Sequence, residues 1–287
     1  MSAPSTGPTA VLKFGGEVVA DRAQLLRVLE SVAELVARGW RFLLCHGGGP
    51  QVSALTRRLG NEPLMVGGRR VTDLPTLQIA KQVLAGEVSV DVTSAALAAG
   101  LEAVGFTGVS ARTVYARRRA PKVVSGGGPE PVDFGWVGDV IEIRTHLIHH
   151  LWEGGFTPVL STLGVGDLDG EVRGPVYNIN ADTVASAVAH ALNVDHLFLM
   201  TSVPGVLRDK DDPTTRIPRL AAADARAAIA EGIIVGGMIP KVEEALEPLR
   251  REPGGPGVGA VHILGADGDV LFAEAALAGS RGTVLVP

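Results

Sequence analysis

Cysteine is almost absent from this sequence of 287 residues, which contains only Cys45. A single cysteine cannot form a disulfide bond within the chain, and it cannot be part of a cysteine cluster that holds a metal ion. A disulfide framework is therefore excluded. A lone cysteine also fits a reducing compartment.

Long apolar runs are missing as well. No stretch of about 18 apolar residues occurs, which is the length needed for a membrane-spanning helix. Residues 1–9 lack the positive charge and the following apolar core of a signal peptide. We therefore expect a cytoplasmic protein that has no membrane partner.

The chain has no excess of basic residues. It carries 26 Lys and Arg against 31 Asp and Glu, a formal net charge of −5. Proteins that bind nucleic acids normally present a positive surface, so we expect no nucleic-acid partner. Hydrophobic residues are plentiful at 46%, and this composition is typical of a globular protein of one large or two modest domains.

Two units of strand, glycine turn and helix follow each other near the start of the chain. Apolar residues 11–14 precede Gly15 and Gly16, and Asp21 then begins a segment with helical spacing. Residues 41–45 precede a second glycine cluster and Pro50, which favours a helix start. This pattern predicts an α/β fold with an open, mostly parallel sheet covered by helices on both faces. Ligands of such sheets bind at the carboxyl ends of the strands, where both glycine turns lie.

The rest of the chain predicts further alternation around one different segment. Residues 74–100 are helix-rich with a break expected near Gly86, and residues 104–144 suggest hairpins that form a lid beside the glycine turns. Helices are predicted at 145–153, 181–192, 221–231 and 242–251, and strands at 156–161, 196–201, 260–264 and 283–286.

Two lysines are candidates for binding an anion. Lys13 is the only charge in the first strand and directly precedes the first glycine turn. It could reach solvent from the strand end, or it could contact phosphate oxygens beside the backbone N–H groups of the glycines. Lys241 lies near a predicted helix start, where a positive charge is unfavourable unless an anion binds there. A solvated lysine is the alternative.

The sequence His46-Gly47-Gly48-Gly49-Pro50 resembles the oxyanion loop of some lipases. That reaction needs a G-x-S-x-G motif followed by an acidic residue and a histidine. The nearest sequence, residues 278–282, is Ala-Gly-Ser-Arg-Gly, and neither partner follows it, so a hydrolase is excluded. The cluster is then a second anion-binding loop, or it allows close packing of strand and helix.

Polar residues in later segments suggest a small-molecule site. Asn178 and Asp182 are four residues apart and would share a helix face, although Asn and Asp also stabilise helix starts in general. Arg70 could bind a carboxylate through two N–H groups, or it could be simply exposed. Residues 202–207 follow a predicted strand and suit a nucleotide-binding loop.

Two familiar site types are not supported. His146, His149 and His150 have helical spacing, but no acidic or cysteine ligand at suitable spacing joins them, so we predict no metal site in the protein. The sequence contains no Gly-Lys dipeptide, which excludes a P-loop.

Taken together and in order, these segments resemble the amino acid kinase family, and within it the members that phosphorylate N-acetylglutamate. Two positions depart from the family pattern: Ser89-Val90 stands where Asn-Lys is usual, and Ser110-Ala111-Arg112 where Asp-Gly is common. The first departure affects packing or a subunit contact rather than chemistry. The resemblance rests on Lys13-Phe14-Gly15-Gly16, His46-Gly47-Gly48-Gly49-Pro50, Gly68-Arg69-Arg70-Val71-Thr72-Asp73, Phe134-Gly135-Trp136-Val137-Gly138-Asp139, Asn178-Ile179-Asn180-Ala181-Asp182, Val203-Pro204-Gly205-Val206 and Gly237-Met238-Ile239-Pro240-Lys241.

The resemblance implies a single kinase domain and a role for each of these segments. Residues 1–9 would be a disordered tail, 10–175 an acetylglutamate-binding lobe and 176–287 an ATP-binding lobe. Lys13 and Lys241 would stabilise the transition state, and Asp182 would orient both. The acceptor would be held by Gly48, Gly49, Arg70 and Asn178, and ATP by Gly15, Gly16, Gly47, Ser202, Val203, Pro204, Gly205, Val206 and Leu207.

The reaction chemistry agrees with these residue types. A γ-carboxylate with a pKa near 4.3 is already ionised at neutral pH, so the nucleophile needs no catalytic base. Mg²⁺ would arrive with ATP and keep several waters. A kinase for another small carboxylate, such as a carrier-linked aminoadipate, is the alternative, as is a binding or regulatory protein on the same fold. The latter would be expected to lose one of the two lysines.

The resemblance also raises the question of regulation, because arginine-inhibited hexamers of the family are joined through an extra N-terminal helix. Residues 1–9 include Pro4, Gly7 and Pro8 and no apolar face, whereas an independent helix needs on the order of 12 residues. The C-terminal segment only partly resembles the arginine-binding segment. We therefore expect a homodimer that is insensitive to arginine.

Overall fold

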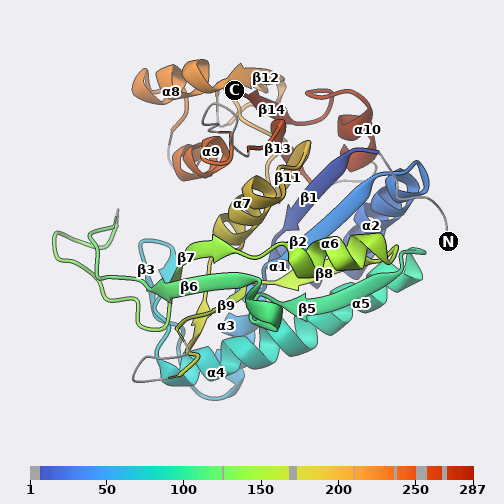
Figure 1. Ribbon diagram of the computed structural model, residues 1–287. Helices are drawn as coiled ribbons and strands as arrows, with labels where there is room; N and C mark the ends of the chain where they lie inside the picture. Colours follow the sequence, from blue (N-terminus) through green and yellow to red (C-terminus); the bar gives the residue numbers. More distant parts are fainter. Residues whose placement is uncertain are drawn as a thin grey trace.

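An eight-stranded sheet forms the centre of the computed structural model, which describes residues 7–124, 126–167, 173–209, 211–235, 238–249, 257–266 and 270–287 (Figure 1). Its strands are β1 (Thr9–Phe14), β2 (Arg41–His46), β5 (Ala103–Thr107), β8 (Thr157–Ser161), β11 (His196–Thr201), β12 (Arg219–Ala221), β13 (Ala260–Gly265) and β14 (Thr283–Val286). Their order is β12-β14-β13-β11-β1-β2-β8-β5. All neighbours run parallel except β13 and β14, which pair antiparallel. The predicted open, mostly parallel α/β sheet is confirmed.

Helices cover both faces of the sheet because alternate residues of each buried strand point to opposite sides. Val11 and Leu43 belong to one apolar cluster, and their neighbours Leu12 and Leu44 belong to the other. The first face carries α6 (His146–Glu153), α7 (Ala181–Leu192), α8 (Ala222–Ala230) and α9 (Met238–Leu246). The second carries α1 (Gly16–Ala20), α2 (Arg22–Ala37), α3 (Gly49–Arg58), α4 (Leu74–Gln82), α5 (Ser89–Ala98) and α10 (Val270–Ala276).

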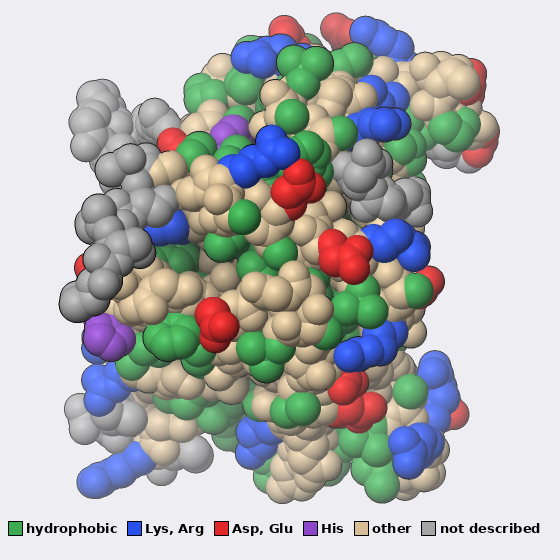
Figure 2. Space-filling model, turned by 90° about the vertical axis from the view of Figure 1, so that its right-hand side faces the viewer, with side chains coloured by type: hydrophobic (Ala, Val, Ile, Leu, Met, Phe, Trp, Pro, Cys, Tyr) green, Lys and Arg blue, Asp and Glu red, His purple; other side chains and the backbone are tan. Residues whose placement is uncertain are grey.

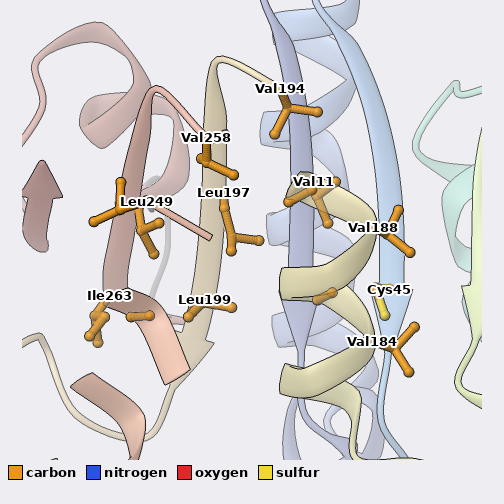
Figure 3. Packing of buried hydrophobic residues seen from close by; sticks show 14 of the residues in the cluster. Val11, Cys45, Val184, Val188, Val194, Leu197, Leu199, Leu249, Val258 and Ile263 are labelled. Atoms are coloured by element: carbon orange, nitrogen blue, oxygen red, sulfur yellow. The ribbon is translucent and has the colours of Figure 1, made fainter. Parts of the chain in front are cut away.

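Helix α7 packs on the strands at the middle of the sheet. Its Val184 and Val188 are fully buried and lie close to Val11 of β1 and Cys45 of β2 (Figure 3). Asn180 caps this helix by accepting hydrogen bonds from the backbone N–H groups of Asp182 and Thr183. The apolar face and the cap together fix the start of α7 at the carboxyl edge of the sheet.

Charged side chains of both signs lie on the face of the molecule that Figure 2 shows. Acidic and basic side chains are interspersed among uncharged ones, and several acidic groups lie beside basic ones. None of the helices in the described ranges is long and apolar enough to cross a membrane.

The segment 104–144 corrects part of the sequence prediction. The expected hairpin exists, formed by antiparallel β6 (Val114–Arg118) and β7 (Gly138–Ile143), and β9 (Leu163–Val165) and β10 (Val176–Asn178) extend it to four strands. Residues 103–107, however, form β5 at the edge of the main sheet, parallel to β8. Gly105 explains this placement, since a Cβ there would lie 2.8 Å from the Thr93 hydroxyl of α5. The strand can therefore pack directly on that helix.

Two helix predictions also need correction. The helical segment 74–98 is not broken at Gly86. The π-helical segment Val83–Val88 contains this glycine and joins α4 directly to α5. The helix expected at 242–251 begins at Met238 and ends at Leu246, shortly before Pro248, which cannot continue a helix. The expected tail begins outside the described residues, but Thr9 already belongs to β1.

The remaining elements are short. They are strands β3 (Met65–Val66) and β4 (Arg69–Arg70), which form a separate two-stranded hairpin, and 3₁₀ turns at Ser110–Arg112 and Pro213–Thr215.

The two glycine turns contact each other where β1 and β2 end. A Cβ on Gly16 would lie 3.1 Å from the Cα of Gly48 and 2.8 Å from the Cδ of Pro50. The Gln51 side chain donates a hydrogen bond of 2.7 Å to the Gly16 carbonyl and so ties the turns together. A Cβ on Gly48 would in turn meet Leu84 of the π-helical segment at 2.5 Å. A side-chain-free residue is therefore favoured at position 16, where ring and backbone atoms lie close, whereas at position 48 the flexible end of Leu84 would have to move.

A buried polar cluster joins the C-terminal loop to the sheet. Glu274 of α10 accepts hydrogen bonds from the backbone N–H groups of Gly279, Arg281 and Gly282, and its Oε1 lies 2.8 Å from Nδ1 of His262. Burial alone would raise the pKa of this carboxyl, but these hydrogen bonds outweigh it and lower the pKa to about 2. The ionised form of Glu274 is therefore strongly stabilised by the fold.

We expect this carboxylate to make the protein acid-sensitive. Lowering the pKa from 4.5 to about 2 corresponds to ~3 kcal/mol of unfolding free energy, present above pH 4.5 and lost as the pH falls towards 2. Glu274→Gln should lose a similar amount at pH 7 and show a flatter dependence below pH 4.5. Urea denaturation at a series of pH values measures this, with Glu30→Gln as the exposed control. Equal stability of Glu274→Gln and the parent at pH 7 would contradict the assignment.

The contact between the glycine turns gives a second expectation. Gly16→Ala should lower the unfolding free energy by about 1–3 kcal/mol, because the added methyl group meets backbone atoms that cannot move independently. Gly86→Ala is the matched control: its Cβ would meet nothing within 4 Å, and alanine favours a helix. The denaturant midpoints of the two variants, compared with that of the parent protein, measure this difference in stability. If both variants were equally stable, the turns would not be packed as described.

Candidate active site

Two cavities lie at the carboxyl end of the central strands, where β1, β2 and β11 stop. Each has a volume of about 500 Å³. They share one wall, whose residues are Lys13, Gly15, Glu17, Asp182 and Glu244. A group bound in one cavity can therefore reach a group bound in the other beside these side chains.

An ion pair occupies the shared wall. The Lys13 Nζ lies 2.8 Å from Oδ1 of Asp182, and only 12% of the lysine side chain is exposed. Asp182 is held in place because it lies in the first turn of α7, directly after the Asn180 cap. The resemblance implies that Asp182 orients Lys13, and the structure places these two side chains in contact.

Lys241 joins the pair from α9. Its ammonium group donates a hydrogen bond to the Thr201 hydroxyl at the end of β11. Burial lowers the pKa of Lys241, and the nearby positive charge of Lys13 lowers it further, while Asp182 and Glu17 act in the opposite direction. Two ammonium groups are thus held near one carboxylate, and an additional anion between them would be attracted.

The first cavity has a largely apolar lining with a few polar groups. It is lined by Val18, Leu199, Met200, Ile263 and Ala266 together with Gln24, Thr201, Ser202 and Gly265. Of the loop 202–207 only Ser202 lines it. Val206 is instead fully buried, and its N–H donates a hydrogen bond of 2.8 Å to the Thr283 hydroxyl. Gly16 and Gly47, which the sequence analysis assigned to the same ligand as Gly15, line the second cavity rather than the first.

The second cavity holds the predicted acceptor residues. Gly48, Gly49, Arg70 and Asn178 all line it. One terminal nitrogen of Arg70 donates hydrogen bonds to the Gly49 carbonyl at 2.9 Å and to the Ser53 hydroxyl at 2.7 Å. The other, Nη1, is buried without a partner among the described residues. Burial lowers the pKa of this guanidinium, so an anionic partner for the open nitrogen would be favoured.

Further charged residues of the second cavity were missed by the sequence analysis. Arg69, Arg119 and Lys122 line its outer wall, and Arg119 pairs with Asp139 of β7 at 2.7 Å. Glu17 and Glu244 were also missed. The run Arg117-Arg118-Arg119 was visible in the sequence, but its spacing alone does not tell which of the three faces a cavity.

The residues behind the glycine turns are not suited to proton transfer. Burial raises the pKa of the Cys45 thiol to about 12 and lowers the pKa of His46 to about 4. Both are therefore neutral near pH 7. Across the described parts of the chain, no group of three or more His, Cys, Asp or Glu side chains is placed to hold a metal ion.

Similar proteins were found by sequence. Acetylglutamate kinase from Anaeromyxobacter dehalogenans is 49% identical over 283 residues, which cover 97% of this chain and 98% of that protein. Acetylglutamate kinase from Sorangium cellulosum is 48% identical, with 99% and 96% of the two chains covered.

Solved structures show the same fold at lower identity. N-acetylglutamate synthase from Neisseria gonorrhoeae, complexed with coenzyme A and N-acetylglutamate, has a TM-score of 0.78 at 24% identity, covering 99% of this chain and 60% of that one. Carbamate kinase from Giardia has a TM-score of 0.68 at 18% identity, covering 98% and 99%. The model of the amino acid kinase family matches residues 8–264. The chain thus belongs to the amino acid kinase family.

Proposed function

We propose that this protein transfers the γ-phosphoryl group of ATP to the γ-carboxylate of N-acetyl-L-glutamate, a step of arginine biosynthesis that yields N-acetyl-L-glutamyl 5-phosphate. The observation that carries the proposal is the pair of cavities that meet at Lys13 and Asp182. Acetylglutamate kinases at 48–49% identity over nearly the whole chain support this choice of acceptor.

ATP would occupy the first cavity and the acceptor the second. The apolar lining of the first cavity suits a nucleotide base, and Ser202, directly after β11, would contact the rest of the nucleotide. In the second cavity, the open nitrogen of Arg70 would bind a carboxylate and Asn178 would donate to a polar group of the acceptor. The lobe 10–175 would then supply most acceptor contacts and the lobe 176–287 most nucleotide contacts.

Positive charge and N–H donors carry the chemistry in this proposal. The acceptor carboxylate attacks as an anion, so no side chain has to remove a proton. Lys13 and Lys241 stabilise the negative charge of the phosphoryl group in transfer, and Asp182 keeps both ammonium groups in place. Gly15, Gly16 and Gly47 allow backbone N–H groups to approach the phosphates from the two glycine turns.

The donor set fits a Mg²⁺ ion that enters with ATP. Glu17 and Asp182 line the first cavity, but the described residues offer no complete set of ligands for a metal ion. Such an ion would keep waters and phosphate oxygens as its main ligands and would neutralise part of the triphosphate charge.

The acceptor is tested by an assay with a panel of carboxylates. Purified protein, MgATP and hydroxylamine are mixed with N-acetylglutamate, glutamate, aspartate, carrier-linked aminoadipate or no acceptor, and the acyl phosphate is trapped as a hydroxamate. We expect hydroxamate with N-acetylglutamate. Hydroxamate with another member of the panel only would replace the proposed acceptor, and none with any would contradict the kinase.

We further propose a homodimer that is insensitive to arginine. Exposed apolar side chains on α5 support an interface with a second copy, since Val90 is 63% and Leu97 52% exposed. Light scattering should give twice the chain mass, and millimolar arginine should leave the rate unchanged. A hexamer with sigmoidal inhibition by arginine would contradict both statements.

The two lysines should control turnover. Lys13→Ala and Lys241→Ala are each expected to lower kcat by roughly 10² or more, because each removes one preorganised positive charge from the transition state. Asp182→Asn should also lower kcat, since the amide no longer attracts both ammonium groups. Lys81→Ala on α4 is a surface control. If the Lys13→Ala or the Lys241→Ala variant were correctly folded and had normal turnover, that lysine would have no role in catalysis.

The acceptor residues should act on a different kinetic constant. Arg70→Ala and Asn178→Ala are expected to raise the KM for N-acetylglutamate about tenfold or more and to leave the KM for ATP little changed. Initial-rate measurements with each substrate varied in turn separate the two constants. An effect mainly on the KM for ATP would move both residues to the nucleotide site.

A further inference from the structure

Glu244 lies where the two cavities meet, and neither the sequence motifs nor the reaction outlined above assigns it a role. It is one helical turn after Lys241 on α9, is half-buried and lines both cavities. Its neighbour Glu243 is exposed and lines neither cavity. Two adjacent glutamates of one helix therefore differ only in whether they face the site.

The charges around Glu244 come from several elements. Lys13 at the end of β1, Arg69 of β4 and Arg119 after β6 all attract its carboxylate. Lys122, from the same outer wall, is also close enough to interact with it. Asp182 of α7 is the repelling group.

The remaining neighbours of α9 contribute little charge near Glu244. Helix α9 packs on α7 and α8, and the charged residues of α8, Asp224 and Arg226, are exposed. The Glu244 carboxylate forms no direct ion pair or hydrogen bond with any residue that the structure describes. It is thus held among cations without being bound to one of them, and its carboxylate is free to respond to a ligand.

Burial and Asp182 together raise the pKa of Glu244 above its ordinary value, against the opposing effect of the three cations. The ionised form of Glu244 is therefore already destabilised in the empty site. Anionic ligands will destabilise it further. The proposed acceptor brings two carboxylates and ATP brings its phosphates, and each would compete with Glu244 for the same cations.

We propose that the Glu244 carboxylate neutralises the neighbouring cations when the two cavities are empty, and that it takes up a proton when anionic substrates bind in them. The inference rests on the proposed kinase function, because it assigns the two cavities to anionic ligands. Glu244 is a positioning residue in this account, since it acts through Lys13, Arg69, Arg119 and Lys122.

The direction of the coupling follows from the charges. Bound anions favour the neutral form of Glu244, so the bound protein holds its proton up to a higher pH than the empty protein does. At pH values between the pKa of Glu244 in the empty protein and its pKa in the bound protein, binding takes up a proton. The affinity for anions therefore increases as the pH falls through this range.

Calorimetry tests this directly with MgADP and with N-acetylglutamate as separate probes. Titrations at a series of pH values from about 5 to 8, in buffers of different ionisation enthalpy, give the number of protons taken up on binding. We expect uptake by the parent protein and by Glu243→Gln, and a clear reduction in Glu244→Gln. At about pH 8 the Glu244→Gln variant should bind MgADP roughly 3–30 times more tightly than the parent, because one repelling charge is gone. Equal proton uptake and equal affinity in Glu243→Gln and Glu244→Gln would overturn the proposal.

The two probes separate this inference from the proposed acceptor. If the parent protein fails to bind N-acetylglutamate but MgADP shows the difference between the two glutamine variants, the acceptor is wrong and the role of Glu244 stands. If both ligands bind and the variants do not differ, the role of Glu244 is wrong and the acceptor stands. Glu244→Ser provides a second neutral side chain, and thermal unfolding of each variant verifies that a change in binding is not a change in folding.

Discussion

The ion pair between Lys13 and Asp182 is the contact on which the rest of the site depends. It joins the end of β1 to the first turn of α7, two elements that are about 170 residues apart in the chain. Both cavities open onto it, and the second lysine, Lys241 of α9, lies near enough to interact electrostatically with both residues of the pair. Because the pair is mostly shielded from water, its charges interact more strongly than they would on the surface.

The fold supplies the rigidity that this pair needs. β1 lies between β2 and β11 at the centre of the sheet, and helices cover it on both sides. The glycine turns pack closely against each other and are joined by the hydrogen bond from Gln51, and the Leu84 side chain of the π-helical segment packs against Gly48. Charges held on such a frame stabilise a transition state without having to reorganise during the reaction. The outer wall of the second cavity is different, since its cations come from short strands and a hairpin.

Local sequence signals predicted the elements well wherever caps and periodicity agreed. The predicted bounds of α7 are the observed ones. Asn180 caps the start of this helix, and Asn193, in the left-handed conformation with φ of 51°, ends it. Strand β11 was also predicted correctly as a continuous apolar run. The edge strand β5 was missed because its glycine and its partly exposed residues carry a weak strand pattern, and only its contacts with α5 and β8 decide the outcome.

The site was predictable where residues lie next to glycine turns and helix starts, as Lys13, Gly48, Asp182 and Lys241 do. It was not predictable for Glu17, Glu244, Arg69, Arg119 and Lys122, since their approach to the cavities depends on how distant elements pack. Backbone strain was equally hidden. Ala111 and Arg112 both have positive φ values, 50° and 55°, in the segment where the family commonly has Asp-Gly.

We propose that a nucleotide and an acceptor carboxylate meet at Lys13 and Asp182. Calorimetric binding of N-acetylglutamate in the presence of MgADP, with and without aluminium fluoride, tests it most directly, because the fluoride complex imitates the phosphoryl group only when both ligands are in place. We expect simultaneous binding of both ligands and an increase in affinity of about 10² or more with the fluoride complex. Mutually exclusive binding of the two ligands, or no effect of aluminium fluoride, would contradict it.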